Sequence, residues 1–365
     1  MIVKNEEKTL PRLTDSLQDQ LDHWTIVDTG STDGTKDVVR DLFGHLPGEL
    51  IEDEWRGYGP SRNVALRAGS RHTDWLVTLD ADETVSGDLR ADLDASDADV
   101  IEARQQYGIL RFWLPRVIRS AAPWRWEGRA HEYLTLGDIT PRAVRSSAFT
   151  VVHHADGGNR PDKLERELRL LEADLEDMPD DPRTTFYVAR THEDMGSPAR
   201  AAEFYRRRTE LVGWDEERWY ARWRLGTCLL RLDKHEEAAG VLLSAWNERP
   251  WRVEPLYSLA THYREQGQWQ MCWEIGLLAA KYTASRPDGR GPAPENDRLF
   301  LHEDAYRWGM AYERSISAWY VGELAQGRRL CEYLLGEELP PEIRHSVMAN
   351  RSYYAPGEGR PRSRR

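Results

Sequence analysis

The chain has 365 residues, with 50 Lys and Arg against 62 Asp and Glu, which gives a formal net charge of -12. This length is sufficient for two domains. The negative charge disfavours nonspecific binding to nucleic acid or to an anionic membrane, because both require a basic surface.

The cysteines and the apolar runs indicate the class of protein. Cys228, Cys272 and Cys331 are far apart in helix-like sequence, without zinc spacing, and argue against a disulfide framework. The sequence shows no signal peptide and no apolar run long enough to cross a bilayer. We therefore expect a cytoplasmic protein without a membrane span.

The first half of the chain alternates between strand-like and helix-like segments. Short strands are predicted at 1–3, 24–27, 50–51 and 75–79, and helices within 10–21, 38–42 and 61–66. A surface helix and loop are predicted at 88–99, followed by strands at 107–114, 117–118 and 149–152. This alternation predicts a Rossmann-like, mostly parallel α/β sheet covered on both faces.

Carboxylates follow the strand at 75–79. In such a sheet, ligands bind at the carboxyl ends of the strands, and Asp80 and Asp82 lie two residues apart at one such end. Both could serve one Mn²⁺ or Mg²⁺ ion and the phosphates that it carries. The alternative is an acidic turn after a buried strand.

Polar and aromatic residues are concentrated in two further segments. Residues 124–133 mix Trp, Arg, His and Glu, which is typical of the wall of a site, and His153-His154 follows the last predicted strand. If that strand continues through both histidines, their side chains point to opposite faces, so at most one of them can bind a metal.

In this order, the segments of the first 155 residues resemble a family-2 glycosyltransferase of the GT-A fold. The residues that carry the resemblance are Met1-Ile2-Val3-Lys4-Asn5-Glu6-Glu7, Val27 through Thr35, Arg62-Asn63, Leu79-Asp80-Ala81-Asp82-Glu83, Gly128 with His131-Glu132, and His153-His154. The resemblance implies metal-dependent transfer of a hexose from a nucleotide diphosphate sugar, with a UDP-sugar favoured, and inversion at the anomeric carbon. A Gln-x-x-Arg-Trp motif of processive synthases is missing, which favours transfer of a single sugar.

The resemblance also implies a role for each matching residue. Asp28, Lys4 and Glu6 would form the nucleotide pocket, with Arg62 beside it and Asp80 near the ribose and the metal. Asp82 would bind the metal with His153 or His154, and Glu132 or His131 would be the general base.

Each of these roles has a structural alternative. Asp28 could cap the following helix, and Arg62 could be a cation on a helix surface. Glu132 could pair with Arg129, in which case the base is His131 or lies elsewhere.

The second half reads as paired helices. After a linker helix at 159–182, residues 183–350 show tetratricopeptide-like spacing of small and large residues, before a basic, disordered tail at 351–365. The matching positions are Leu225, Gly226, Ala238, Ala245 and Pro250, with Ala201, Tyr205, Leu259, Tyr263, Cys272 and Ala279 in neighbouring units and a looser unit at 306–335. A concave surface of such repeats could hold a peptide or protein acceptor, with Tyr187, Arg190, Trp219 and Arg222 as candidates for its groove.

These observations predict a catalytic domain at 1–158 followed by helical repeats. The acceptor remains open between a protein or peptide, a cell-envelope glycan, a lipid and a small molecule, and a homo-oligomer is compatible with the sequence. The main alternative is a non-catalytic repeat scaffold with a degenerate transferase domain. A nucleotidyltransferase is disfavoured because no Gly-rich loop with a basic residue lies near residue 4.

Overall fold

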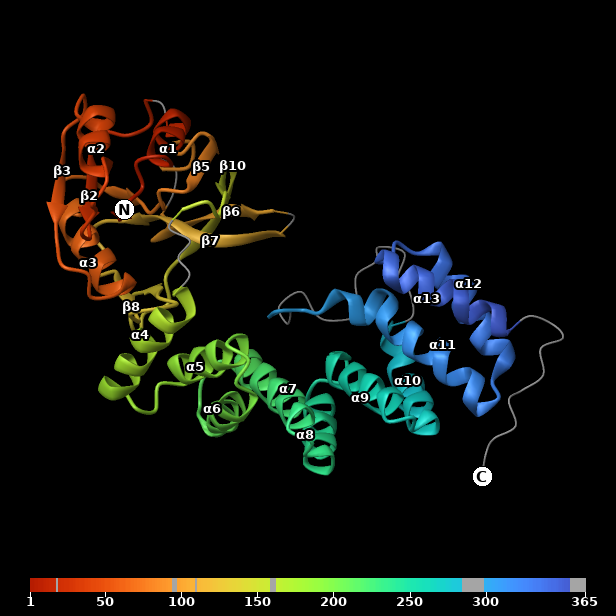
Figure 1. Ribbon diagram of the computed structural model, residues 1–365. Helices are drawn as coiled ribbons and strands as arrows, with labels where there is room; N and C mark the ends of the chain where they lie inside the picture. Colours follow the sequence, from red (N-terminus) through yellow and green to blue (C-terminus); the bar gives the residue numbers. More distant parts are fainter. Residues whose placement is uncertain (18, 94–96, 109, 158–161, 284–298, 355–365) are drawn as a thin grey trace. The chain divides into compact units, whose positions relative to one another are not determined.

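The computed structural model describes the chain except residues 18, 94–96, 109, 158–161, 284–298 and 355–365. Its internal contacts divide the chain into two compact units, Met1–Pro179 and Asp180–Arg365 (Figure 1). The predicted linker helix is α4 (Lys163–Asp177), and by its contacts it belongs to the first unit.

The first unit begins with a three-stranded parallel sheet. Strands β1 (Ile2–Val3) and β3 (Gly48–Glu52) pair on either side of β2 (Trp24–Asp28). Helices follow the three strands in turn: α1 (Leu10–Leu17), α2 (Thr35–Phe43) and α3 (Tyr58–Gly69). This part therefore has the predicted βαβ architecture. Apolar residues of its strands, helices and the turn after β4 form one buried cluster: Val3, Leu10, Ile26, Val39, Phe43 and Ala81.

The second sheet of this unit is mixed rather than mostly parallel, which corrects one detail of the prediction. Its strand order is β4-β7-β6-β10-β5, and only β6 and β10 pair in parallel. The chain reverses directly between β6 and β7, with Tyr107 opposite Leu110, so no helix separates these strands. The strands are β4 (Trp75–Val77), β5 (Glu83–Gly87), β6 (Val100–Tyr107), β7 (Leu110–Arg119) and β10 (Ala143–His153), and β8 (Arg125–Glu127) and β9 (Tyr133–Thr135) form a separate ribbon.

The helix predicted within 88–99 is absent from the described part of that segment, where residues 89–93 form turns. The Asp88 side chain accepts a hydrogen bond from the Arg90 N–H at 2.8 Å, and the Gln20 side chain accepts one from the Leu89 N–H at 2.7 Å. Such side-chain bonds compete with the helical pattern of backbone bonds.

A cavity of about 500 Å³ lies between β2 and β4. Its lining includes Ile26, Trp75 and Leu76, and Arg62 reaches its edge, whereas Asp80 and Asp82 do not line it. The cavity is therefore distinct from the polar cluster described below.

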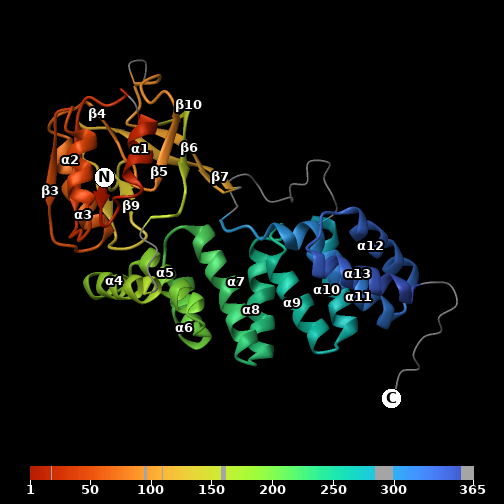
Figure 2. The ribbon, with the colours of Figure 1, turned by 45° about the horizontal axis from the view of Figure 1, so that its top comes forward.

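The second unit is a stack of antiparallel helix pairs, as predicted (Figure 2). The pairs are α5–α6, α7–α8, α9–α10 and α11–α12, with a π-helical turn before α11 and α13 packed after α12. The bounds are α5 (Pro182–Asp194), α6 (Pro198–Glu210), α7 (Asp215–Arg231), α8 (His235–Glu248), α9 (Glu254–Glu265), α10 (Trp269–Thr283), η1 (Ala305–Gly309), α11 (Met310–Val321), α12 (Leu324–Gly336) and α13 (Pro341–Tyr353).

The small residues of the repeat pattern allow the helices to approach closely. A Cβ placed on Gly226 would lie 2.5 Å from Leu242 Cγ, so α7 and α8 could not pack in this way around a larger residue. Ala201, Ala238 and Ala245 are fully buried at the equivalent contacts. The spacing read from the sequence therefore marks the core of the stack.

Two predictions for this unit are wrong in part. Trp219 is fully buried and donates its indole N–H to the Ala245 carbonyl at 2.7 Å, so it belongs to the core and not to a groove. Helix α13 reaches Tyr353, within the predicted tail. The rest of the tail and the Pro/Gly-rich segment 286–294 lie outside the described residues.

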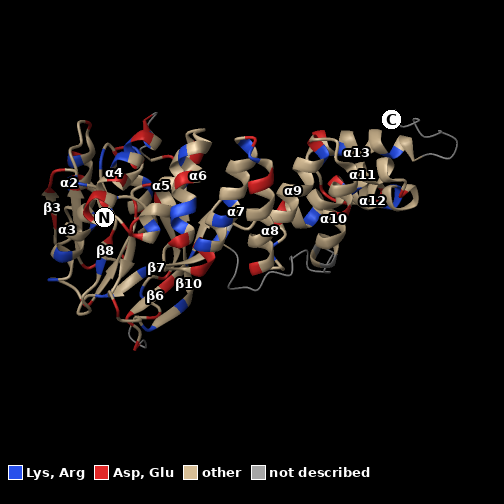
Figure 3. Ribbon diagram, turned by 90° about the horizontal axis from the view of Figure 1, so that it is seen from below, with Lys and Arg blue, Asp and Glu red and all other residues tan. Residues whose placement is uncertain are grey.

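Charge is mixed over the described surface. In the view of Figure 3, Lys and Arg are interspersed with Asp and Glu from α2 to α10. Within the described residues, no helix is long and apolar enough to cross a bilayer.

We expect the three cysteines to be unreactive in the folded protein. Burial raises the pKa of Cys228 to about 12 and that of Cys272 and Cys331 to about 11. At pH 8, only about one thiol in a thousand or fewer would then be the reactive thiolate. Titration with dithionitrobenzoate should show almost no fast reaction in the native protein and three thiols per chain in guanidinium; fast native labelling would contradict this burial.

Candidate active site

The turns that follow β1 and β2 are joined by hydrogen bonds. The Asn5 side chain accepts from the Thr32 N–H and the Glu7 carboxylate accepts from the Gly34 N–H, both at 2.8 Å. The Glu6 N–H donates to Thr35 Oγ1 at 2.7 Å. The two turns therefore form one fixed wall at the carboxyl ends of the parallel strands, where ligands of such sheets bind.

Asp28 lies in this wall with one oxygen unused by the described residues. Its Oδ1 accepts from the N–H groups of Gly30 and Ser31, so Asp28 does stabilise the turn. Its Oδ2 is buried and has no hydrogen-bond partner there. A buried carboxylate oxygen without a partner is costly, and it is well suited to accept an N–H from a ligand such as a nucleobase. Lys4 Nζ lies on the other side of the turn, 3.9 Å from a Cβ placed on Gly30.

Arg62 of α3 connects two of the predicted site residues. Its Nη2 donates to Asp80 Oδ1 and its Nε to Glu132 Oε1, each at 2.7 Å. The guanidinium lies 5.1 Å from the centre of the Trp126 ring. Arg62 is therefore a partly buried link between the carboxylate after β4 and the loop before β9, and the alternative of a surface cation is wrong.

Arg62 and Asp80 each favour the charged form of the other. Burial alone would lower the pKa of Arg62, but Asp80 and Glu132 outweigh it and the pKa lies above its ordinary value. Burial alone would likewise raise the pKa of Asp80, yet Arg62 and Arg116 bring it below its ordinary range. Opposite charges at contact distance in a buried site favour the charged forms.

A close backbone contact places Glu132 opposite Arg62. A Cβ on Gly59, in the first turn of α3, would lie 2.1 Å from the Gly128 carbonyl oxygen. The Tyr58 N–H donates to the Arg129 carbonyl at 2.7 Å. Only glycine at position 59 lets α3 dock on the loop at 128–132 in this way, and Arg62 follows three residues later on the same helix.

The loop residues adjacent to Glu132 face α4. His131, with φ +50°, places its Nε2 2.6 Å from Glu167 Oε1. Arg129 binds Asp174 through its backbone N–H and its side chain at 2.7 and 2.8 Å, and Asp177 at 2.7 Å. The suggested Glu132–Arg129 pair is therefore wrong, and of the two candidate bases it is Glu132 that faces Asp80 through Arg62.

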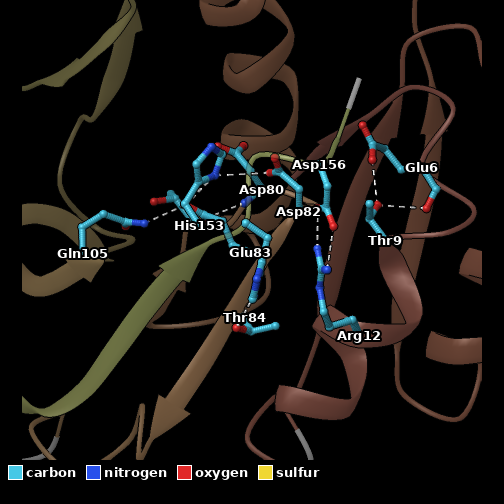
Figure 4. Close-up of polar contacts among 12 residues, drawn as sticks. Glu6, Thr9, Arg12, Asp80, Asp82, Glu83, Thr84, Gln105, His153 and Asp156 are labelled. Carbon is cyan, nitrogen blue, oxygen red and sulfur yellow. Dashed lines mark hydrogen bonds and ion pairs between the residues drawn. The ribbon is translucent and has the colours of Figure 1, made fainter. Parts of the chain in front are cut away.

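The two histidines at the end of β10 have different surroundings, since His153 is its last residue and His154 follows it. His153 Nδ1 lies 3.5 Å from Asp82 Oδ1 and 3.9 Å from Glu83 Oε1 (Figure 4). His154 instead places its Nε2 2.9 Å from Thr84 Oγ1. The pairing of His153 with Glu83 in the β10–β5 ladder decides which imidazole reaches Asp82.

Sequence reasoning missed the role of Glu83. This carboxylate is buried and accepts from Arg116 at 2.5 and 3.1 Å, from the Gln105 amide at 3.4 Å and from the Asp80 N–H at 2.9 Å. Arg116 also donates to the Thr78 carbonyl at 3.1 Å. The buried pair of Glu83 and Arg116 thus fixes the backbone at Thr78 and at Asp80, on both sides of Leu79. Its position next to Asp82 was the only signal in the sequence, because Arg116 and Gln105 come from other strands.

We expect Arg116→Met to destabilise the first unit by about 3–5 kcal/mol, because it leaves the Glu83 charge buried without its partner. The double variant with Glu83→Gln should recover part of this loss, since the buried charge is then removed as well. Thermal and urea unfolding followed by fluorescence would measure both. Lys36→Ala, which breaks an exposed pair with Glu52, serves as the control and should cost less than about 1 kcal/mol. If Arg116→Met and Lys36→Ala lowered the free energy of unfolding equally, the buried pair would not stabilise the unit as argued.

The donor set near Asp82 is compatible with a hard divalent cation. Among the described residues, no group of three or more His, Cys, Asp and Glu side chains could by itself hold a metal. Asp82 and His153 nevertheless present an oxygen and a nitrogen 3.5 Å apart. Neighbouring ligands of an octahedral ion with bonds of about 2.1 Å lie about 3 Å apart. An ion such as Mg²⁺ usually takes one or two ligands from the protein when it binds a phosphate substrate. Phosphate oxygens and water fill its remaining positions.

Comparison with known proteins agrees with this geometry. Residues 1–126 match the model of the family described as glycosyl transferase family 2. The chain contains a family-2 glycosyltransferase domain. The match covers β1 through β7, ends within β8, and includes Asp28, Arg62, Asp80 and Asp82.

Several curated proteins resemble parts of this chain. A TPR repeat-containing protein of Synechococcus elongatus is 30% identical over 200 residues, which are 50% of this chain and 48% of that protein. The lipopolysaccharide core biosynthesis glycosyltransferase LpsC of Rhizobium meliloti is 35% identical over 91 residues, 25% of this chain and 33% of the relative. The prophage-derived glycosyltransferase SunS of Bacillus subtilis is 22% identical over 205 residues, 52% of this chain and 47% of the relative. The chain thus spans about half or less of the length of these relatives.

Among solved structures, MamA aligns with 52% of this chain and 92% of its own, with 15% identity and a TM-score of 0.36. YrrB, described as a TPR protein with an unusual peptide-binding site, aligns with 52% of this chain and 82% of its own, with 12% identity and a TM-score of 0.37.

Proposed function

We propose that the first unit transfers one sugar from a nucleotide diphosphate sugar to an acceptor, with inversion at the anomeric carbon. The observation that carries this proposal is the partly buried link from Asp80 through Arg62 to Glu132. It ties Asp80, a carboxylate within the residues 1–126 that match the family-2 glycosyltransferase model, to Glu132, a carboxylate beyond the match that can act as a base.

The donor would bind against the wall formed by the first two turns. Asp28 Oδ2 is available there as an acceptor for an N–H of the base, and Lys4 supplies a positive charge beside it. Glu6 lies in the same wall, and burial together with Asp82, Asp33 and Asp80 raises its pKa, although the hydroxyl of Thr9 opposes this. A UDP-sugar is the first donor to test, because the resemblance favours it.

The cation would be Mn²⁺ or Mg²⁺, held by Asp82 and His153, with Asp80 adjacent to the donor phosphates. When bound, such an ion neutralises the charge that develops on the departing nucleoside diphosphate. The chain itself orients these ligands through Glu83 and Arg116 below Asp80 and Asp82.

Glu132 would remove the acceptor proton. An acceptor oxygen forms its bond to the anomeric carbon while the bond from that carbon to the phosphate oxygen breaks, and the proton of the acceptor hydroxyl passes to Glu132. The nucleoside diphosphate leaves with the electron pair. Arg62 keeps Glu132 in place for this transfer, and no covalent nucleophile is required for a single inverting displacement.

A protein or peptide is the acceptor we favour, because a stack of helix pairs provides an extended surface for such a partner. A saccharide acceptor is the second candidate, supported by the lipopolysaccharide core biosynthesis named for one relative of the catalytic domain.

Calorimetric titration with UDP, GDP and their common sugar conjugates, with and without Mn²⁺, tests the donor site. We expect one nucleotide sugar to bind only in the presence of the cation and to release nucleoside diphosphate slowly in water. If the folded protein binds none of them under either condition, the transferase proposal is wrong.

A further inference from the structure

The segment Leu299–His302 of the second unit lies across the first helices of three successive pairs. It enters η1, and Figures 1 and 2 both show the chain before η1 passing beside α7. Connections between the preceding pairs are short, such as residues 249–253 between α8 and α9. Because α10 and η1 are themselves in contact, a turn of ordinary length would suffice here, and the return of Leu299–His302 to α5 and α7 is not needed to connect the helices.

The Phe300 side chain occupies an aromatic pocket between α5 and α7. Its ring stacks on Phe186 of α5, with centres 6.4 Å apart and planes 7° apart, and meets Tyr220 of α7 edge-on at 5.1 Å. The Arg190 guanidinium lies over its face at 4.1 Å. Phe300 is nevertheless 40% exposed, so its ring is held in a surface pocket and not in the core.

The backbone of the same segment is held by buried charged side chains. The Leu299 N–H donates to Glu216, and its carbonyl accepts from Arg252 Nη2 at 3.1 Å. The His302 N–H donates to Glu254 Oε1 at 3.4 Å. With the segment in place, Arg252 and Glu254 are fully buried and Glu216 is 5% exposed. Arg252 also pairs with Glu254 at 2.9 Å, so these two groups hold each other as well as the segment.

These two sets of contacts resemble the recognition of a peptide more than the packing of a loop. Hydrogen bonds to backbone N–H and carbonyl groups can bind a segment of any sequence. The aromatic pocket with the Arg190 guanidinium instead selects for an aromatic side chain at one position. Glu216 and Arg252 would lose hydrogen bonds if the segment simply left, and a second segment with the same backbone and an aromatic residue would restore them.

We propose that the groove of α5, α7 and α9 is a binding site for an aromatic-containing segment of a protein, and that Phe300 occupies it within the chain as a competitor. The partner is an unstructured segment with Phe or Tyr flanked by aliphatic residues, such as the chain itself carries at Leu299-Phe300-Leu301. The identification of that partner as the acceptor rests on the proposed function. The existence of the binding site does not depend on it. Arg190 was predicted for such a groove, whereas Arg222 pairs with Glu248 instead.

The test uses the full chain and a fluorescent, acetylated peptide with the sequence of residues 299–304. We expect weak binding to the native protein and at least about tenfold tighter binding to Phe300→Ala, because the tethered competitor is weakened. Phe300→Ala combined with Leu301→Ser should bind tighter still, since both apolar anchors of the segment are removed. A peptide with Ala in place of Phe should bind none of these proteins.

Two further proteins serve as controls. Tyr320→Ala removes an exposed aromatic ring that stacks on Trp269 outside the groove, and it should leave peptide affinity at the native value. Arg190→Ala in the Phe300→Ala background should abolish the gain. If Phe300→Ala melts like the native protein but binds the peptide no better, or if it binds both peptides equally, the groove does not recognise an aromatic segment. Because neither donor nor cation is present, this result is independent of whether transfer occurs.

Discussion

Replacing Asp82 with Asn should abolish cation-dependent binding of the donor sugar and lower the release of nucleoside diphosphate by about 10³-fold. Asn keeps the size of the side chain but loses the charge that a hard cation prefers. A bound cation contributes several kcal/mol to the stabilisation of developing phosphate charge, and each loss of about 1.4 kcal/mol lowers the rate tenfold. Calorimetry with the donor and Mn²⁺, and a coupled assay for the released diphosphate, would measure both effects.

Matched variants separate a metal ligand from a general loss of charge. Asp37→Asn changes an exposed carboxylate of α2 that pairs with Arg40, and it should leave binding and rate unchanged. His153→Ala should lower the affinity for Mn²⁺, whereas His154→Ala should not, because that imidazole is directed to Thr84. An Asp82→Asn protein that binds the donor as well with Mn²⁺ as the native chain would contradict a metal role for Asp82.

Much of this site could be predicted from the sequence, because the patterns that mark it lie within short stretches of the chain. An apolar run that ends in Asp80 and Asp82 marks a strand end wherever the strand lies in the sheet. The alternation of small and aromatic residues around Leu225 and Gly226 marks helix contacts for a similar reason, since one repeat packs against the next in chain order.

What the sequence could not supply depends on pairing between distant segments. Arg116 reaches Glu83 only because β7 lies beside β6 and β4 in a mixed sheet, whereas the sequence pattern predicted a mostly parallel sheet and no strand at 100–106. The sequence indicated that at most one of the two histidines binds a metal if the strand continues through both. The structure ends β10 at His153, and the register of His153 with Glu83 shows which imidazole reaches Asp82. The burial of Trp219 likewise follows from tertiary packing between helices, because its indole bonds to the next helix, α8.

Glu132→Gln should lower the rate of transfer by about 10²–10⁴-fold while leaving donor affinity nearly unchanged, because the amide cannot accept the acceptor proton. The amide oxygen can still accept the bond from Arg62 Nε, so Arg62 should remain on Asp80 and the donor side should keep its shape. This separates the variant from Arg62→Met, which removes both bonds and should weaken donor binding as well. The measurements are single-turnover rates and donor dissociation constants for each protein.

The adjacent histidine provides the decisive comparison. His131 lies 2.6 Å from Glu167 on α4 and on the other side of the loop from Arg62, so His131→Gln should disturb the loop and lower the rate by less than Glu132→Gln. The pH dependence distinguishes them further, because loss of a carboxylate base removes an acidic limb that loss of a positioning residue leaves in place. If His131→Gln removes that limb and Glu132→Gln retains it, the base is His131, and the link through Arg62 serves only to position the donor.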